Sequence, residues 1–307
     1  MTLAFISHSD VGRHDNGWHH PEHVGRLRAI TRALRDHFEL FTELDHLEGR
    51  HATEEELKLV HDPAYIARVR AMSEAGGGRF DADTAVSEGT WDAATAGAGS
   101  VLEAVERSLD GRNLRSFAAV RPPGHHALRD HAMGFCFFGN IAIAAHHARN
   151  LGAKRVLIVD WDVHHGNGTQ ALVEQEPEIH FVSMHQWPWY PGSGAAEDRG
   201  PHRSVWNVPM AAGLAPARYR DALLGAVDAA TTGWRPDLVL ISAGFDSLAG
   251  DPLGGFTLEL DDVTALTRTL VKSAEGWCGG RVVSALEGGY DPVRLGAAVV
   301  AHLEALR

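Results

Sequence analysis

The sequence predicts an α/β fold in which a mainly parallel sheet is covered by helices on both faces. Four short runs rich in Val, Ile and Leu, at residues 154–160, 178–183, 237–243 and 280–286, indicate strands that are buried on both faces. Helical patterns separate these runs, and such alternation is typical of a three-layer α/β/α, doubly wound arrangement. Because ligands bind at the carboxyl ends of the strands in such sheets, we expect the chemistry there.

The first half of the chain carries signals for helix starts. Thr53 and Glu56 have the spacing of a capping box before a short helix. Pro63, directly after Asp62, is a favourable first residue for the next helix. Residues 140–150 form a further helical stretch with Ala-rich packing.

Helical periodicity returns between the strands of the second half. The apolar residues from Tyr219 to Ala230 keep i, i+3, i+4, i+7 spacing, and residues 263–271 repeat the pattern before the last strand. No internal repeat, charged block or Pro/Ser linker divides the chain. We therefore expect residues 1–307 to form a single domain.

The composition excludes several classes of protein. The 307 residues include 28 Lys and Arg against 40 Asp and Glu, and this net charge of −12 argues against broad nucleic-acid binding. The apolar runs are too short to span a membrane, and residues 1–10 lack a secretory signal pattern. Because Cys136 and Cys278 cannot form a disulfide framework, we expect a reducing, cytoplasmic location. The 20 histidines favour a metal enzyme.

Metal-binding side chains follow two of the predicted strands. Asp162 and His164 come just after the strand at 154–160, and residues two apart in an extended segment point the same way. Asp246 follows the strand at 237–243. One imidazole and two carboxylates leave a coordination position for water or substrate, as a catalytic zinc site requires. Ferrous iron also suits this mixed ligand set.

Two further strand ends carry candidate catalytic side chains. His125 and His126 lie on a Pro-Gly loop after a strand expected at 116–120, where they can act as a base and an electrostatic partner. Tyr290 follows the strand at 280–286 and two glycines. Its phenol can donate a hydrogen bond to a developing oxyanion without adding charge.

Together these segments resemble the zinc-dependent histone deacetylase superfamily, which includes the acetylpolyamine amidohydrolases. The matching segments, in order over about residues 118–292, are RPPGHHA, GFCFFGN, DWDVHHGNGTQ, SMHQWPWYPGSG, SAGFDSLAGDPLGG and EGGY. HPEHVGRL and FDADTAVSEGT extend the resemblance over nearly the whole chain. Asn167 stands where the class I pattern has aspartate, so the chain is most similar to the class II and bacterial branch.

The resemblance implies an arginase-like fold, one deacetylase catalytic domain and one zinc ion. Asp162, His164 and Asp246 would bind this ion. His126 would be the general base and then the general acid, with His125 as its electrostatic partner.

The resemblance also implies positions for the supporting residues. Asp160 would hold His125, and Asn167 would contact His126. Tyr290 would stabilise the oxyanion.

A narrow acyl-lysine tunnel is implied by the same resemblance. Phe135 and Tyr190 match its aromatic walls, and Gly134 and Leu253 are expected to contact substrate beside them. Asp83 matches a rim aspartate that holds the substrate backbone in family members.

By analogy with the family, a structural potassium ion is also expected. It would lie near Asp160, Asp162, His164, Ser183 and Met184.

The expected reaction is hydrolysis of an acyl amide on lysine or a lysine-like amine, so the partners are acetylated peptides, proteins or small amines. Acetylpolyamine deacetylation is the nearest alternative. One polyamine-selective branch has glutamate at the position of Leu253 in the DPxG turn, which favours acyl-lysine here. The discrimination is modest, because Asp83, Glu88 or a partner subunit can supply the negative charge. Bacterial relatives often pair, so a homo-oligomer also stays open.

Two other classes fit less well. A binuclear manganese ureohydrolase of arginase type needs a further carboxylate two residues beyond the ligand histidine, where this chain has Gly166. A non-catalytic module that only recognises acyl-lysine has no need of His126 and Tyr290, both of which are retained.

Overall fold

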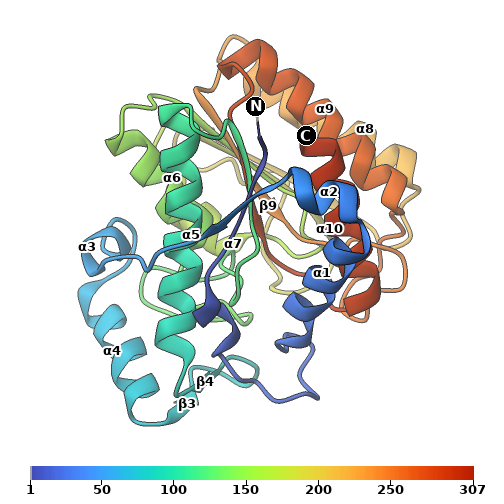
Figure 1. Cartoon of the computed structure of the whole chain (residues 1–307). Helices are drawn as coiled ribbons and strands as arrows, with labels where there is room; N and C mark the ends of the chain where they lie inside the picture. Colours follow the sequence, from blue (N-terminus) through green and yellow to red (C-terminus); the bar gives the residue numbers. More distant parts are fainter. Residues whose placement is uncertain (1) are drawn as a thin grey trace.

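The computed structural model describes residues 2–307 and confirms the predicted three-layer α/β/α fold (Figure 1). An eight-stranded sheet forms the middle layer, and all of its neighbouring strands run parallel. Across the sheet, the strands are β2 (Asp45–Glu48), β1 (Ala4–Ser7), β5 (Arg115–Ala118), β10 (Val282–Leu286), β9 (Leu238–Ala243), β6 (Val156–Asp160), β7 (Ile179–Gln186) and β8 (Val205–Met210).

Helices cover both faces of this sheet (Figure 1). One face packs against α5 (Thr90–Asp110), α6 (Asn140–Asn150) and α7 (Asn167–Val173). The other face carries α8 (Pro216–Thr231), α9 (Leu260–Cys278) and α10 (Pro292–Leu306), with α1 (Gly25–Asp36) against α10 and α2 (Phe38–Glu43) against α1. The residues of β6, β9 and β10 are all buried, as expected for strands covered on both faces.

Smaller elements lie outside the three layers. A short 3₁₀ helix, η1 (Ser9–Gly12), follows β1 and contacts α5. The helices α3 (Glu54–Leu57) and α4 (Pro63–Glu74) precede a two-stranded antiparallel hairpin of β3 (Gly77–Arg79) and β4 (Ala85–Ser87). Figure 1 shows this hairpin at one end of the long helix α5.

The predicted strands are present, although β6 and β10 begin two residues later than expected, at Val156 and Val282, and two strands need a correction at their carboxyl ends. The strand expected at 116–120 is β5, which ends at Ala118, because the amide of Val120 donates to the Ala118 carbonyl and the chain turns there. The strand expected at 178–183 continues to Gln186, because β8 pairs with it as far as Met210.

The helix signals read from the sequence are confirmed. Thr53 and Glu56 form a reciprocal capping box at α3, and Pro63 opens α4. The pattern noted at 263–271 is the middle of a longer helix, α9, which ends where Gly279 adopts a positive φ of 67°. In residues 2–307, no helix has the length and apolar character needed to cross a membrane.

Candidate active site

Buried carboxylates gather at the carboxyl ends of three adjacent strands. Asp160 is the last residue of β6, Asp246 lies three residues beyond β9, and Glu287 directly follows β10. All three side chains, and that of Asp162, are fully buried. Because an isolated buried carboxylate is costly, this concentration of negative charge requires cationic partners or dense hydrogen bonding.

Asp162, His164 and Asp246 converge as the sequence predicts. His164 Nδ1 lies 3.0 Å from Asp162 Oδ1 and 3.2 Å from Asp246 Oδ2. The three ligand atoms all lie within 4.8 Å of one another. The reason expected for this convergence is wrong in part, because the segment beyond β6 is not extended. Asp162 Oδ1 accepts a hydrogen bond from the His164 amide at 2.9 Å, and this turn brings the two side chains together.

The polar atoms of this cluster fit a metal ion. Asp246 Oδ1 accepts a hydrogen bond from the Val163 amide at 2.8 Å, but the buried Oδ2 has no hydrogen-bond partner among residues 2–307. Burial and the neighbouring Asp162 carboxylate raise the pKa of Asp246 to about 7. A cation shared by the two carboxylates and His164 would give Asp246 Oδ2 a partner and would offset the cost of burying both charges.

Two glycines leave room for these carboxylates. A Cβ at Gly244 would lie 2.2 Å from Asp162 Oδ2. A Cβ at Gly288 would lie 2.0 Å from Asp246 Oδ2 and 2.6 Å from Asp162 Oδ2. The amide of Gly288 also donates to Asp162 Oδ2 at 2.8 Å, so the backbone at this position approaches the ligands closely enough to orient them.

The two adjacent histidines have different partners, and both expected contacts are present. His125 Nδ1 lies 2.9 Å from Asp160 Oδ2, and His126 Nδ1 lies 2.7 Å from Asn167 Oδ1. The two ring centroids are 4.0 Å apart. Because a carboxylate stabilises an imidazolium and an amide oxygen does so far less, the two rings have different proton affinities.

The pKa values of the pair follow from these surroundings. Burial alone would lower the pKa of His125, but the carboxylates of Asp162 and Asp160 outweigh it and raise this pKa well above its ordinary value. For His126, burial and the positive charge on His125 together hold the pKa well below its ordinary value. At neutral pH, His125 therefore keeps its proton and His126 is free to accept one.

Glu287 is a site residue that the sequence analysis did not single out. Its Oε2 accepts hydrogen bonds from the amides of Gly124 and His125, at 2.7 and 3.1 Å, and its Oε1 accepts one from Ser242 Oγ at 3.0 Å. Glu287 thus fixes the loop that carries the histidine pair. The signal was available, because Glu287 follows an apolar strand just as Asp160 ends one.

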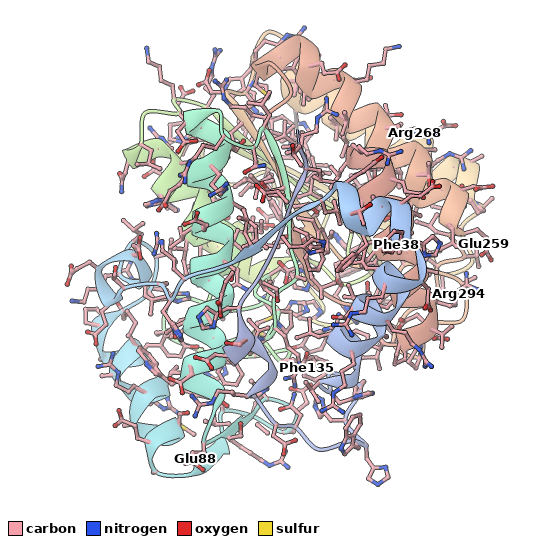
Figure 2. The ribbon with its side chains drawn as sticks, viewed as in Figure 1. Phe38, Glu88, Phe135, Glu259, Arg268 and Arg294 are labelled. Carbon is pink, nitrogen blue, oxygen red and sulfur yellow. The ribbon has the colours of Figure 1, made fainter. Side chains whose placement is uncertain are left out.

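A cavity of about 210 Å³ opens beside the cluster of Asp162, His164 and Asp246 and reaches His164. All five predicted substrate contacts line it, together with His126, His164, Tyr290 and the unpredicted Trp189; the five are Asp83, Gly134, Phe135, Tyr190 and Leu253. Figure 2 shows Phe135 and Glu88, which follows β4, in the lower half of the view. Asp83 is exposed, whereas His126 and Tyr290 are buried, so Asp83 marks the mouth of the cavity and the other two its depth.

Local backbone geometry shapes the walls of this cavity. Gly134 has a φ of 54°, and a Cβ there would lie 2.4 Å from His126 Cδ2, so glycine is required for the loop to pack on the imidazole. Phe135 also has a positive φ, 67°. Trp189 was missed because nothing separates it in the sequence from its aromatic neighbours; its Nε1 donates to the Leu253 carbonyl at 2.9 Å and joins two loops of the wall.

The backbone and ring of Tyr290 are held from three sides. Its amide donates to Asp251 Oδ2 at 2.7 Å, and its ring packs at 6.0 Å, edge to face, on Phe135. The guanidinium of Arg26 lies 5.0 Å from the centre of the same ring. The Tyr290 hydroxyl has no hydrogen-bond partner among residues 2–307, so it is available to a ligand in the cavity.

A buried ion-pair network supports this side of the site and was also missed. Arg26 and Arg121 both donate to Glu22 Oε1, at 3.2 and 2.7 Å, and all three side chains are fully buried. Arg26 also donates to the Gly289 carbonyl at 2.7 Å, just before Tyr290. The charged residues were visible in the sequence, but their burial depends on long-range packing.

The residues expected around a potassium ion are buried beneath the site. Asp160 and Ser183 pair across β6 and β7, and Met184 follows on β7. Potassium at this place stays a prediction.

Comparisons with known proteins agree with this geometry. The histone deacetylase domain profile matches residues 20–306. The chain belongs to the histone deacetylase family. It is therefore a hydrolase of the deacetylase type. This deacetylase is 39% identical, over 83% of its own length and 70% of the other, to the histone deacetylase-like amidohydrolase of Pseudomonas aeruginosa.

Two further comparisons cover nearly the whole deacetylase chain. An uncharacterized protein of Synechocystis sp. is 39% identical over 99% of each chain. The crystal structure of the HDA15 HD domain superposes with a TM-score of 0.93 at 35% identity, covering 99% of this chain and 90% of that one.

The contact between Gly288 and the two carboxylates leads to a first prediction. We expect Gly288→Ala to lose bound metal, because its Cβ would lie 2.0 Å from Asp246 Oδ2. Metal content per chain, measured by plasma mass spectrometry after dialysis, checks this. Gly276→Ala is the matched control, since a Cβ there meets nothing within 4 Å, and it should keep its metal. Equal metal content in both variants would contradict the close packing described here.

Proposed function

We propose that this deacetylase is a zinc-dependent amide hydrolase that removes acetyl or other acyl groups from the side-chain amine of lysine or a lysine-like substrate. One observation carries the proposal: Asp162, His164 and Asp246 converge at a narrow cavity that His126 and Tyr290 also line. A metal ligand set, a histidine of low pKa and a free phenol are the groups that amide hydrolysis by water requires.

Asp162, His164 and Asp246 would hold the ion. Bound there, Zn²⁺ would supply Lewis-acid polarisation of the acyl carbonyl and would lower the pKa of a water molecule. Zinc is favoured over Fe²⁺ by its preference for few, closely held N and O ligands. The cavity beside the cluster leaves an open side from which substrate and water can approach.

His126 is the proposed general base. The Asn167 oxygen can only accept a hydrogen bond, so His126 Nδ1 carries a proton and Nε2 keeps its lone pair. Nε2 takes the proton from water as the water oxygen attacks the acyl carbon. The same nitrogen then gives this proton to the amine nitrogen as the C–N bond breaks, which yields the free amine and a carboxylic acid that releases its remaining proton to solvent as it becomes carboxylate. His125, paired with Asp160, stays protonated throughout and stabilises the negative charge that develops beside it.

Tyr290 is the proposed oxyanion donor. Its hydroxyl is free to donate a hydrogen bond to the carbonyl oxygen as that oxygen becomes negatively charged. The bond from its amide to Asp251 and the packing of its ring on Phe135 hold the phenol in place before substrate arrives. No reorganisation is then needed when the charge develops.

The shape of the cavity supports an unbranched acyl-amine chain as substrate. Its walls are largely aromatic, and the cavity volume is about 210 Å³, so a methylene chain fits while a bulky group does not. Asp83 at the mouth can accept hydrogen bonds from a peptide backbone. Its loop is ordered by Asp81 Oδ1, which accepts from the amides of Asp83 and Thr84 at 3.1 and 2.6 Å.

An acetylated polyamine is the second candidate, and the same mouth favours it. Asp81 and Asp83 place two carboxylates close together there. Burial and the neighbouring Asp81 carboxylate raise the pKa of Asp83. A distal ammonium would relieve that repulsion. Against this, Leu253 contributes no charge to the lining of the cavity.

A substrate panel tests the proposed function. Metal-quantified protein is incubated with an acetyl-lysine peptide and with acetylated putrescine and spermidine, and free amine is measured with and without chelator. We expect chelator-sensitive release of acetate, with the highest kcat/KM on the peptide. Higher kcat/KM on the polyamines would select the second candidate. Binding of the peptide without turnover of any substrate would leave only an acyl-lysine binding module.

Removal of the Tyr290 hydroxyl should slow the chemical step. We expect Tyr290→Phe to lower kcat by about 10²–10³-fold, the usual cost of losing one oxyanion donor. Zinc content should not change, because the hydroxyl lies outside the ligand set. Steady-state kinetics and metal analysis on the same sample check both points. Activity within a factor of about two of the parent, against that 10²–10³-fold expectation, would exclude the oxyanion role.

The neutral partner of His126 should set the acidic limb of the pH–rate profile. A carboxylate at position 167 would stabilise the imidazolium and raise the pKa of His126. Because the base must be deprotonated to act, we expect the acidic limb of kcat/KM for Asn167→Asp to move to higher pH. Asn167→Gln is the control without added charge. If the aspartate variant kept the parent's acidic limb, His126 would not be the titrating base.

A further inference from the structure

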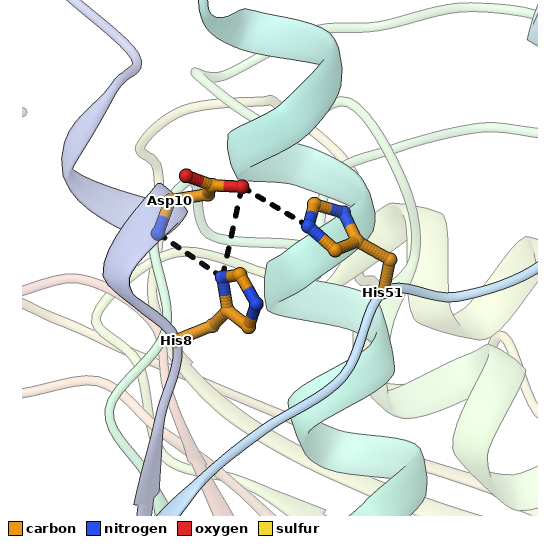
Figure 3. Close-up of side chains that lie close together, drawn as sticks. All are labelled: His8, Asp10 and His51. Carbon is orange, nitrogen blue, oxygen red and sulfur yellow. Dashed lines mark hydrogen bonds and ion pairs between the residues drawn. The ribbon is translucent and has the colours of Figure 1, made fainter.

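A second cluster of metal-binding side chains lies outside the active site, at His8, Asp10 and His51 (Figure 3). We propose that it binds a divalent transition-metal ion such as Zn²⁺ or Ni²⁺, independently of the deacetylase reaction. One ligand atom from each residue lies within 4.8 Å of the other two. None of the three residues lines the cavity of the active site.

The fold brings these residues together from two neighbouring strands. His8 directly follows β1, and Asp10 lies in η1. His51 lies three residues beyond β2, which pairs with β1 in parallel so that Ser7 is opposite Glu48. The cluster therefore sits at the carboxyl ends of two sheet strands, but at the edge of the sheet, far along the strand order from β9 and β6.

His51 directs the Nε2 atom of its ring at the carboxylate of Asp10. The Thr95 hydroxyl donates to the Trp91 carbonyl at 2.8 Å, so it accepts a hydrogen bond from His51 Nδ1, also at 2.8 Å. Nε2 of the neutral ring then carries a lone pair, and it faces Asp10 Oδ2 at 3.1 Å. Two acceptors at this distance require a positive charge between them, either a proton or a metal ion.

His8 adds a third acceptor to the same point. The Nδ1 atom of His8 accepts a hydrogen bond from the Asp10 amide at 3.1 Å, so this nitrogen also carries a lone pair. The same atom lies 3.8 Å from Asp10 Oδ2 (Figure 3). Ligands about 2.0–2.2 Å from a tetrahedral ion are roughly 3.3–3.6 Å apart. The two distances from Asp10 Oδ2, 3.1 and 3.8 Å, bracket that range. A bound ion would take the place of the Asp10 amide as partner of Nδ1.

The backbone on either side of the cluster is firmly held. Gly49 donates to the Ser7 carbonyl at 3.1 Å, and Ala52 donates to the Thr95 carbonyl at 2.9 Å. Helix α5 packs so closely here that a Cβ at Gly99 would lie 2.0 Å from the Arg50 carbonyl oxygen. The backbone that carries the ligands is thus fixed before an ion arrives, which lowers the entropic cost of binding.

The nearby arginine does not occupy Asp10 Oδ2, the oxygen proposed as a metal ligand. The guanidinium of Arg13 is 3.9 Å from the other oxygen, Oδ1, and forms its short ion pair with Asp92. His51 is exposed and the other two ligands are half-buried, so water can complete the coordination shell. This combination of two imidazoles, one carboxylate and solvent suits Zn²⁺, Ni²⁺ or Cu²⁺ better than Mg²⁺ or Ca²⁺.

An ion at this site would anchor the segment that leads to the mouth of the cavity. Beyond η1, the His14 carbonyl accepts from Arg121, and His20 lies 3.3 Å from the Asp83 carbonyl with its ring 4.7 Å from that of Phe135. Binding at His8 and Asp10 would fix the start of this segment to the chain beyond β2. The inferred role is therefore structural: occupancy stabilises the folded chain.

The test separates the two sites by removing the first. In Asp162→Asn/Asp246→Asn, which lacks the charge of the catalytic ligands, we expect isothermal titration with Zn²⁺ to show one ion per chain and a rise in melting temperature. His51→Asn, added to this double variant, keeps an amide that can donate to Thr95 but removes Nε2. We expect this third substitution to weaken Zn²⁺ binding at least about ten-fold, or 1.4 kcal/mol. Adding His202→Ala, at an exposed histidine elsewhere, should change neither readout.

The outcomes decide the proposal without reference to deacetylase activity. Circular dichroism confirms that each variant is folded, and Asp10→Asn, which keeps the shape of the side chain, serves as a second variant if His51→Asn unfolds. Zn²⁺ binding that is unchanged by both substitutions would overturn the assignment. The assignment would also be overturned if the parent double variant bound no ion. A proton on His51 would then supply the positive charge that faces Asp10.

Discussion

The burial of several carboxylates at one edge of the sheet is the constraint on which the rest of this structure depends. Asp160, Asp162, Asp246 and Glu287 are fully buried within a few residues of the ends of β6, β9 and β10. Their surroundings differ: His125 faces Asp160, the Gly288 amide donates to Asp162, and the Gly124 and His125 amides donate to Glu287, whereas one oxygen of Asp246 has no hydrogen-bond partner among residues 2–307. The loops, the glycines and the histidine pair are arranged around that electrostatic requirement.

The same arrangement distributes chemical roles between neighbouring residues of similar type. His125 and His126 are adjacent, yet a carboxylate faces one ring and an amide the other, so that their pKa values move in opposite directions. Close backbone approach at Gly134 and Gly288 fixes the imidazole and the carboxylates without flexible side chains between them. The site is therefore positioned mainly by backbone, which supports a mechanism that needs little rearrangement.

Most of the fold and the centre of the site could be predicted from the sequence, because apolar runs followed directly by Asp or His show both a buried strand and its functional end. The exact ends of the strands were harder to predict: β5 stops at Ala118 because the chain turns there, and β7 continues to Gln186 because β8 pairs with it. Glu22, Arg26 and Arg121 illustrate the same limit, since nothing local distinguishes a buried ion pair from exposed charges. Trp189 lines the cavity and is held there by a contact with Leu253, which is distant in sequence.

The strand order also has a consequence for how the protein matures. The proposed metal ligands follow β6 and β9, which are adjacent in the sheet although helices α7 and α8 and two further strands separate them along the chain. A nascent polypeptide that has not yet inserted β9 beside β6 holds only Asp162 and His164. The cluster of Asp162, His164 and Asp246 is thus complete only when β9 lies beside β6, so a metal ion that needs all three side chains could be held only by a chain whose sheet topology is already formed.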